Sequence, residues 1–191
     1  MAAPPNLDAQ AILETLDRHR IQYILVGGLA AQTRGWRGAT LDVDITPAAD
    51  RENLDRLAAA LTELEAGFRV DPERYPTGFK PPGGLDAATF RGQVSLAFTT
   101  RHGPLDVALV PDGTRGFDDL RRGADHTHVA GTTVRVLVAS ADDIVRSKSA
   151  ANRPKDLAQL PEMIADFERA RRLAREREGP GPGREGRGIE R

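Results

Sequence analysis

The sequence contains no cysteine, which excludes disulfide bridges, zinc sites built on thiolates and cysteine nucleophiles. It has no apolar run of the roughly 18 residues that a membrane-spanning helix needs. Its first residues also lack the basic segment followed by an apolar segment that marks a secretion signal. Any metal must therefore be held by carboxylates or histidines, and we expect a cytoplasmic protein.

An excess of charge of one sign is also missing. The chain has 27 basic and 28 acidic residues and a formal net charge of -1, so no overall positive field attracts nucleic acid. A polyanion would have to be bound by a local patch. Lysine is scarce among the basic residues, which are nearly all arginine. A lysine in this background indicates a site that favours a compact ammonium group over a planar guanidinium.

The length of 191 residues suits one domain with a hydrophobic core. Apolar residues with a period of two, or in short buried runs, predict strands at 22–26, 39–46, 93–100, 104–110 and 132–139. Helical spacing and capping residues predict helices at 8–20, 29–34, 50–64, 141–152 and 154–176. The Pro- and Gly-rich stretch 68–92 indicates a long surface loop. We expect a core at 1–139, a C-terminal helical segment at 140–177 and a disordered tail at 178–191.

Two aspartates lie one residue apart in the stretch ATLDVDIT. Alternation places Leu41, Val43 and Ile45 on one face of a strand and Asp42 and Asp44 on the other. This pattern is typical of a solvated outer face of a sheet. Two like charges on one face repel each other, however, and a divalent cation between them would turn that repulsion into attraction. The pair alone leaves both interpretations open.

A third carboxylate, Asp106, lies in a similar apolar-Asp-apolar pattern, LDVAL. Three carboxylates on neighbouring strands can hold the two metal ions that assist an in-line phosphoryl displacement. Asp106 taken alone is equally compatible with a surface position. Gly27 and Gly28 follow a buried strand, where glycine lets backbone N–H groups approach a polyphosphate, although a simple tight turn needs the same residues.

A second metal-binding pattern is His126 and His128, with Asp125 beside them. On a strand, both rings would share one face and could bind zinc. Because no third histidine lies at metal-ligand spacing, the pattern indicates a polar loop in preference to a zinc site.

The order strand, Gly-Gly, short helix, Arg-x-x-Thr-x-Asp-x-Asp and later carboxylate strand resembles the nucleotidyltransferase superfamily over residues 20–160. The segments RGATLDVDI and SADDIVRSKSAANRPKDLAQLPEM are similar to the AbiEii/MenT-like toxin branch of toxin-antitoxin systems. The resemblance implies a mixed α/β fold, with helices flanking a mixed sheet and further helices at the C-terminus.

The resemblance also implies a role for each matching residue. The implied catalytic residues are Asp42, Asp44, Lys148 and Asp156, and the implied ligands of Mg²⁺ are Asp42, Asp44 and Asp106. The implied nucleotide-binding residues are Gly27, Gly28, Arg37, Thr40 and Lys148, with Lys148 contacting the triphosphate. Two positions depart from the family pattern: Gly28 stands where a serine is frequent, and Gln159 where a second aspartate is usual.

The implied activity is Mg²⁺-dependent transfer of a nucleoside monophosphate from an NTP to the 3′ end of an RNA, most readily tRNA. The implied partner is a cognate antitoxin protein, and no membrane is involved. Two alternatives stay open at this point. One is nucleotidyl transfer to a protein or small-molecule hydroxyl, and the other is a non-catalytic nucleotide-binding module.

Overall fold

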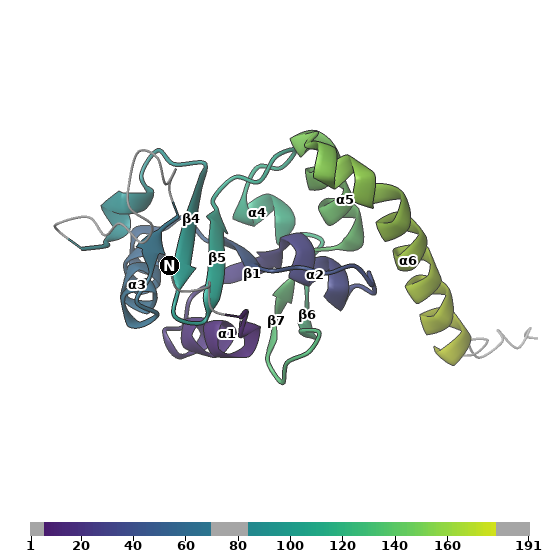
Figure 1. Ribbon diagram of the computed structural model, residues 1–191, viewed down its shortest axis with the longest axis horizontal. Coiled ribbons are helices and arrows are strands. Elements are labelled where there is room, and N and C mark those ends of the chain that lie inside the picture. The colour runs from purple at the N-terminus through teal and green to yellow at the C-terminus, as the bar shows by residue number, and fades with distance from the viewer. Residues whose placement is uncertain (1–5, 70–83, 179–191) are drawn as a thin grey trace, which may run out of the picture.

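The computed structural model describes residues 6–69 and 84–178. Most of the loop expected at 68–92, and the tail expected after the last helix, lie outside these ranges. The described strands form one mixed sheet of seven strands in the order β3-β4-β5-β2-β1-β7-β6. The predicted fold class, a mixed sheet flanked by helices with further helices at the C-terminus, is confirmed (Figure 1).

The strands are β1 (Tyr23–Val26), β2 (Val43–Pro47), β3 (Gly67–Phe68), β4 (Ser95–Thr100), β5 (Gly103–Ala108), β6 (Asp125–His128) and β7 (Arg135–Val138). β2 runs parallel to β5, and β1 runs parallel to β7, whereas the other neighbouring pairs are antiparallel. Every residue of β1 is buried, as expected for a central strand covered on both faces.

The helices are α1 (Ala9–Arg18), α2 (Gly27–Thr33), α3 (Arg51–Glu63), α4 (Phe117–Leu120), α5 (Ala141–Ala151) and α6 (Pro154–Glu178), with a 3-10 turn η1 at Ala87–Phe90. The side chains of Asp8, Asp50 and Ser140 each accept a hydrogen bond from a backbone N–H in the first turn of the helix that follows. These caps satisfy N–H groups that have no partner within the helix, so they fix where α1, α3 and α5 begin.

Figure 1 shows α3 at one end of the molecule and α6 at the other, with the strands between them and α5 next to α6. The core lies between the sheet and the helices, α1 included, and its fully buried members include Ile12, Leu13, Ile24, Leu57, Phe98 and Val107. No helix within residues 6–69 and 84–178 is both long and apolar enough to cross a lipid bilayer.

The structure corrects the predicted start of the strand that carries the aspartates. β2 begins at Val43, so Asp42 lies in a bend directly before the strand, and Leu41 is 78% exposed. The pairing with the neighbouring strands explains this start. The β5 register begins at Val43 opposite Leu105, and the β1 register ends at Asp44, so the backbone before Val43 has no strand partner.

The segment predicted as a polar loop around His126 is also different in the structure. Residues Asp125–His128 form β6, which pairs antiparallel with β7, and His126 lies opposite Leu137. The pairing uses main-chain groups at the edge of the sheet, where polar side chains are common and apolar alternation is not needed.

Candidate active site

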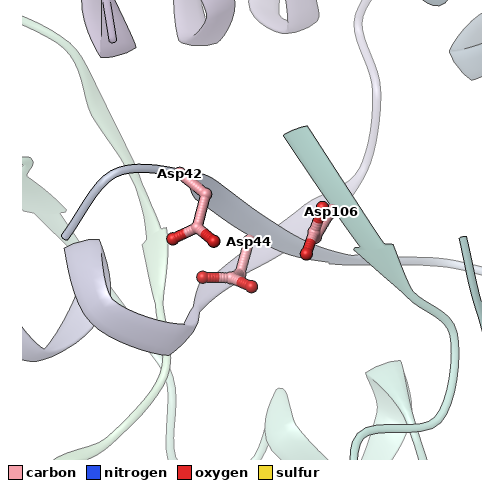
Figure 2. A group of neighbouring side chains, drawn as sticks. All are labelled: Asp42, Asp44 and Asp106. Carbon is pink, nitrogen blue, oxygen red and sulfur yellow. The ribbon is translucent and has the colours of Figure 1, made fainter. Parts of the chain in front are cut away.

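The carboxylates of Asp42, Asp44 and Asp106 converge at the junction of β2 and β5 (Figure 2). One oxygen atom from each residue lies within 4.8 Å of the corresponding atoms of the other two. The parallel register sets Asp44 directly opposite Asp106, and the bend before β2 brings Asp42 beside them. The structure therefore brings together the three residues predicted as metal ligands. Their donor set, carboxylate oxygen alone, suits a hard divalent cation such as Mg²⁺.

Two neighbouring side chains hold the outer carboxylates in place. The Thr40 hydroxyl donates a hydrogen bond of 3.0 Å to Oδ1 of Asp42. The guanidinium of Arg69 donates to both oxygens of Asp106, at 2.7 and 2.8 Å. Sequence reasoning did not identify Arg69, because it lies 37 positions from Asp106 and carries no motif of its own.

Burial raises the pKa of Asp44 to about 7, and the negative charges of Asp42 and Asp106 contribute to the rise. The backbone N–H of Gly28 and the positive charge of Lys148 act in the opposite direction. Burial also raises the pKa of Asp106, although Arg69 opposes the shift. Three carboxylates at this separation are thus poorly compensated by the protein alone, which is the condition that a bound cation relieves.

At both positions of the Gly27-Gly28 turn, a Cβ would require neighbouring side chains to shift. Gly27 has a φ of +65°, and a Cβ at this position would lie 2.0 Å from Oδ2 of Asp44. A Cβ on Gly28 would lie 2.3 Å from the Thr40 hydroxyl oxygen. The turn therefore lets the backbone pass directly over the carboxylates. A contact between this turn and a nucleotide phosphate stays a prediction.

Lys148 and Asp156 form an ion pair that joins α5 to α6. The ammonium nitrogen lies 2.7 Å from Oδ1 of Asp156, and the two side chains are 16% and 6% exposed. Both residues line the same cavity, of about 460 Å³, as the three aspartates and the glycine turn. The structure therefore gathers the predicted lysine and the predicted downstream carboxylate around the metal-ligand candidates.

Arg37 lies apart from this group. It is not among the described residues that line the cavity. Its backbone N–H donates to Asp166 at 3.0 Å, and its side chain lies 3.3 Å from the same carboxylate. Asp166 is only 2% exposed and requires donors, so these contacts anchor the loop before β2 to α6. The structure places Arg37 at this contact with α6, and its role in nucleotide binding stays a prediction.

His126 and His128 have no third metal ligand beside them among the described residues. Within the described ranges, the one group of at least three candidate metal ligands is the aspartate triad. His126 and His128 are exposed on β6.

Comparison with known proteins gives a structural match. No protein-family model matches the sequence, and no curated protein matches it. The crystal structure of the lincosamide antibiotic adenylyltransferase LnuA, bound to lincomycin, matches with a TM-score of 0.54 and 12% identity. The match covers 84% of this chain and 98% of LnuA. The chain has the nucleotidyltransferase fold. The structure of ANT(2'')-Ia in complex with adenylyl-2''-tobramycin also matches, with a TM-score of 0.47 and 15% identity over 88% of this chain and 95% of that one.

The raised pKa of Asp44 predicts that metal binding depends on pH. At pH 6 a carboxyl with a pKa of about 7 is mostly protonated and must lose its proton to bind a cation, whereas at pH 8 it is mostly ionised. We expect Mg²⁺ to bind about tenfold more tightly at pH 8 than at pH 6. Isothermal titration calorimetry at both pH values measures this ratio.

The Asp44→Asn variant is the control, because its side chain cannot titrate and its residual Mg²⁺ affinity should depend much less on pH. The effect of pH on the folding stability of the metal-free protein has the opposite direction. The raised folded-state pKa makes the metal-free protein less stable as pH rises from about 4 through 7, since the folded state holds the proton more tightly. Equal Mg²⁺ affinity at pH 6 and pH 8 would contradict the assignment of Asp44 as a ligand.

The enclosed position of Lys148 predicts that arginine cannot replace it. Lys148→Arg keeps the charge beside Asp156, so the thermal midpoint should change little, but the planar guanidinium is larger and cannot act as a compact charge on phosphate. For the nucleotidyl transfer that the resemblance implies, we expect at least a tenfold loss, close to the loss in Lys148→Ala, and a loss in Asp156→Asn as well. Full transfer by Lys148→Arg in a steady-state assay would refute the role.

Proposed function

We propose that this protein is a Mg²⁺-dependent nucleotidyltransferase that moves a nucleoside monophosphate from an NTP to an acceptor hydroxyl. The observation that carries the proposal is the convergence of Asp42, Asp44 and Asp106, within 4.8 Å, on a cavity that Lys148 also lines. The nucleotidyltransferase fold, shared with LnuA, supports it. A non-catalytic binding module would not need to maintain three carboxylates that repel one another.

The residues of the cavity have separate roles in the proposed reaction. Asp42, Asp44 and Asp106 would hold Mg²⁺, which when bound supplies positive charge against the triphosphate. The ammonium group of Lys148 neutralises phosphate charge from the α5 side of the cavity, and Asp156 holds that group in position. The acceptor oxygen forms a bond to the α-phosphorus and its O–H bond breaks, with the proton passing to solvent water. The bond from the α-phosphorus to the bridging oxygen breaks, and pyrophosphate leaves.

For the acceptor we propose RNA, with the 3′ end of tRNA as the site of addition. The support is the resemblance of the segments around Asp42 and Lys148 to AbiEii/MenT-like toxins. On this account the protein is the toxin of a toxin-antitoxin system, acts in the cytoplasm and is neutralised by a cognate antitoxin.

A second acceptor class is a small cationic molecule that carries a hydroxyl group. Two observations favour it. The similar structure of LnuA holds lincomycin. Acidic side chains also outnumber basic ones around the cavity: Asp42, Asp44, Asp106, Asp112, Asp143 and Asp156 against Lys148, Arg153 and Lys155. Ion pairs with Asp125, Asp119 and Asp142 engage Arg34, Arg122 and Arg171, which lowers the positive charge that these arginines present to RNA.

The test is a transfer assay with Mg²⁺, each of the four α-labelled NTPs, and either total cellular RNA or a panel of lincosamides and aminoglycosides. We expect label on RNA of tRNA size, and we expect growth arrest when the protein is expressed without its partner. Label on the antibiotics alone would replace RNA with the second acceptor class. Label on neither, with every NTP, would contradict nucleotidyl transfer to these acceptors.

The variants Asp42→Ala and Asp44→Ala belong in the same assay. Each removes a metal ligand from the cavity, so transfer should fall at least about a hundredfold while the protein still folds. Glu168→Ala, an exposed carboxylate of α6, is the matched control and should keep full transfer. Near wild-type transfer by both aspartate variants would show that the triad is not the catalytic centre.

A further inference from the structure

A second cavity of about 710 Å³ adjoins the first one. Val110, which follows β5, lines both cavities. The second cavity is formed by the start of α3, the end of η1, the loop after β5 and α4. The charged residues on its wall are Arg51, Arg91, Arg115, Arg121, Asp50 and Asp118. We call it the arginine cavity.

Three arginines of this cavity, Arg91, Arg115 and Arg121, differ from most of the other arginines that the structure describes. Arg34, Arg146 and Arg171, for example, lie 2.6 to 3.0 Å from carboxylate oxygens. Among residues 6–69 and 84–178, no carboxylate lies within ion-pair distance of the guanidinium groups of Arg91 or Arg115. The same holds, within those ranges, for Arg121.

The remaining charges of the cavity do not cancel this positive charge. Arg51 has a partner, Asp55, but at 3.7 Å and with its own side chain 90% exposed, so the pair is weak. The cavity wall holds two carboxylates, Asp50 and Asp118, against four guanidinium groups. The arginine cavity therefore carries a net positive charge directly beside the acidic cavity of the aspartates.

The chain around Arg115 is fixed by hydrogen bonds. Thr114 donates through its hydroxyl to the Pro111 carbonyl at 2.7 Å, and the same hydroxyl accepts the Gly116 N–H at 3.2 Å. The Arg115 N–H donates to Asp119 at 3.1 Å. Gly116 has a φ of +81°, and a Cβ there would lie 2.7 Å from the Leu109 carbonyl oxygen. A rigid turn thus presents Arg115 at the cavity.

We propose that the arginine cavity binds the phosphate backbone of the acceptor RNA. The terminal nucleotide lies at the aspartates, and the phosphates that precede it pass Val110 and contact Arg91, Arg115 and Arg121. Guanidinium groups match phosphate oxygens in a two-pronged geometry, and exposed arginines bind a backbone without selecting a sequence. The inference rests on the proposed RNA acceptor, because a small antibiotic has no phosphodiester chain to reach a second cavity.

The test compares two triple variants with the same change of charge. The first is R91Q/R115Q/R121Q, and the matched control is R172Q/R175Q/R177Q, whose arginines are exposed on α6 at the other end of the molecule from α3 (Figure 1). Binding of unfractionated tRNA is measured by fluorescence anisotropy over a range of salt concentrations. NTP binding with Mg²⁺ and the thermal midpoint are measured for each variant.

For R91Q/R115Q/R121Q we expect the Kd for tRNA to rise at least tenfold. The slope of log Kd against log salt should fall by about 2, since three phosphate contacts are lost. NTP binding should be unchanged, and the α6 control should stay within about twofold of wild type. The variant R91K/R115K/R121K keeps the charge and should recover most of the salt slope.

Two results would overturn the inference in distinguishable ways. If the wild-type protein labels tRNA but R91Q/R115Q/R121Q binds tRNA as well as the wild type does, or no worse than the α6 control, the arginine cavity is not the binding site and the proposed function stands. If the wild-type protein labels antibiotics and neither binds nor labels tRNA, the RNA acceptor and the arginine cavity fail together.

Discussion

Electrostatic repulsion among Asp42, Asp44 and Asp106 is the constraint around which this molecule is organised. A sheet that places three carboxylates within 4.8 Å of one another must compensate them or lose stability as they ionise. The protein supplies partial compensation from several directions: the guanidinium of Arg69, the N–H of Gly28 and the charge of Lys148. The pKa of Asp44 is nevertheless raised to about 7, so the compensation is incomplete. A divalent cation would complete it, and the fold tolerates a local cost that its buried core offsets elsewhere.

The C-terminal helices are part of the site as well as of the fold. Lys148 on α5 and Asp156 on α6 line the cavity that β2 and β5 open into, and Asp166 fixes the loop before β2. Residues on both sides of the boundary expected at 139 and 140 thus contribute to one cavity. Close packing supports the arrangement, because a Cβ on Gly35 would lie 2.8 Å from that of Ala170 on α6.

Much of the site could be predicted from the sequence because its signals are local. The alternation around Asp44, the repeated pattern at Asp106 and the capping residues Asp50 and Ser140 each reflect a short stretch of chain, and the structure confirms the elements that they indicate.

Other features depend on partners distant in the sequence, and these could not be predicted. The start of β2 is set by its pairing with β1 and β5. β6 forms because its main chain pairs with that of β7. Arg69 reaches Asp106, and Asp166 reaches Arg37, across long separations without any periodic pattern. Asp166 is a buried carboxylate on a mostly polar helix, and nothing in the sequence around it indicates which group donates its hydrogen bonds.

The most direct test of the metal-centred account is a crystal structure of the protein soaked with Mn²⁺ and a non-hydrolysable NTP analogue, with anomalous scattering used to locate the metal. The account predicts an anomalous peak in contact with oxygens of Asp42 and Asp44 and beside the triphosphate, and its loss in crystals of Asp44→Asn. A bound nucleotide with no peak at the aspartates, or a peak at His126 and His128 instead, would contradict it.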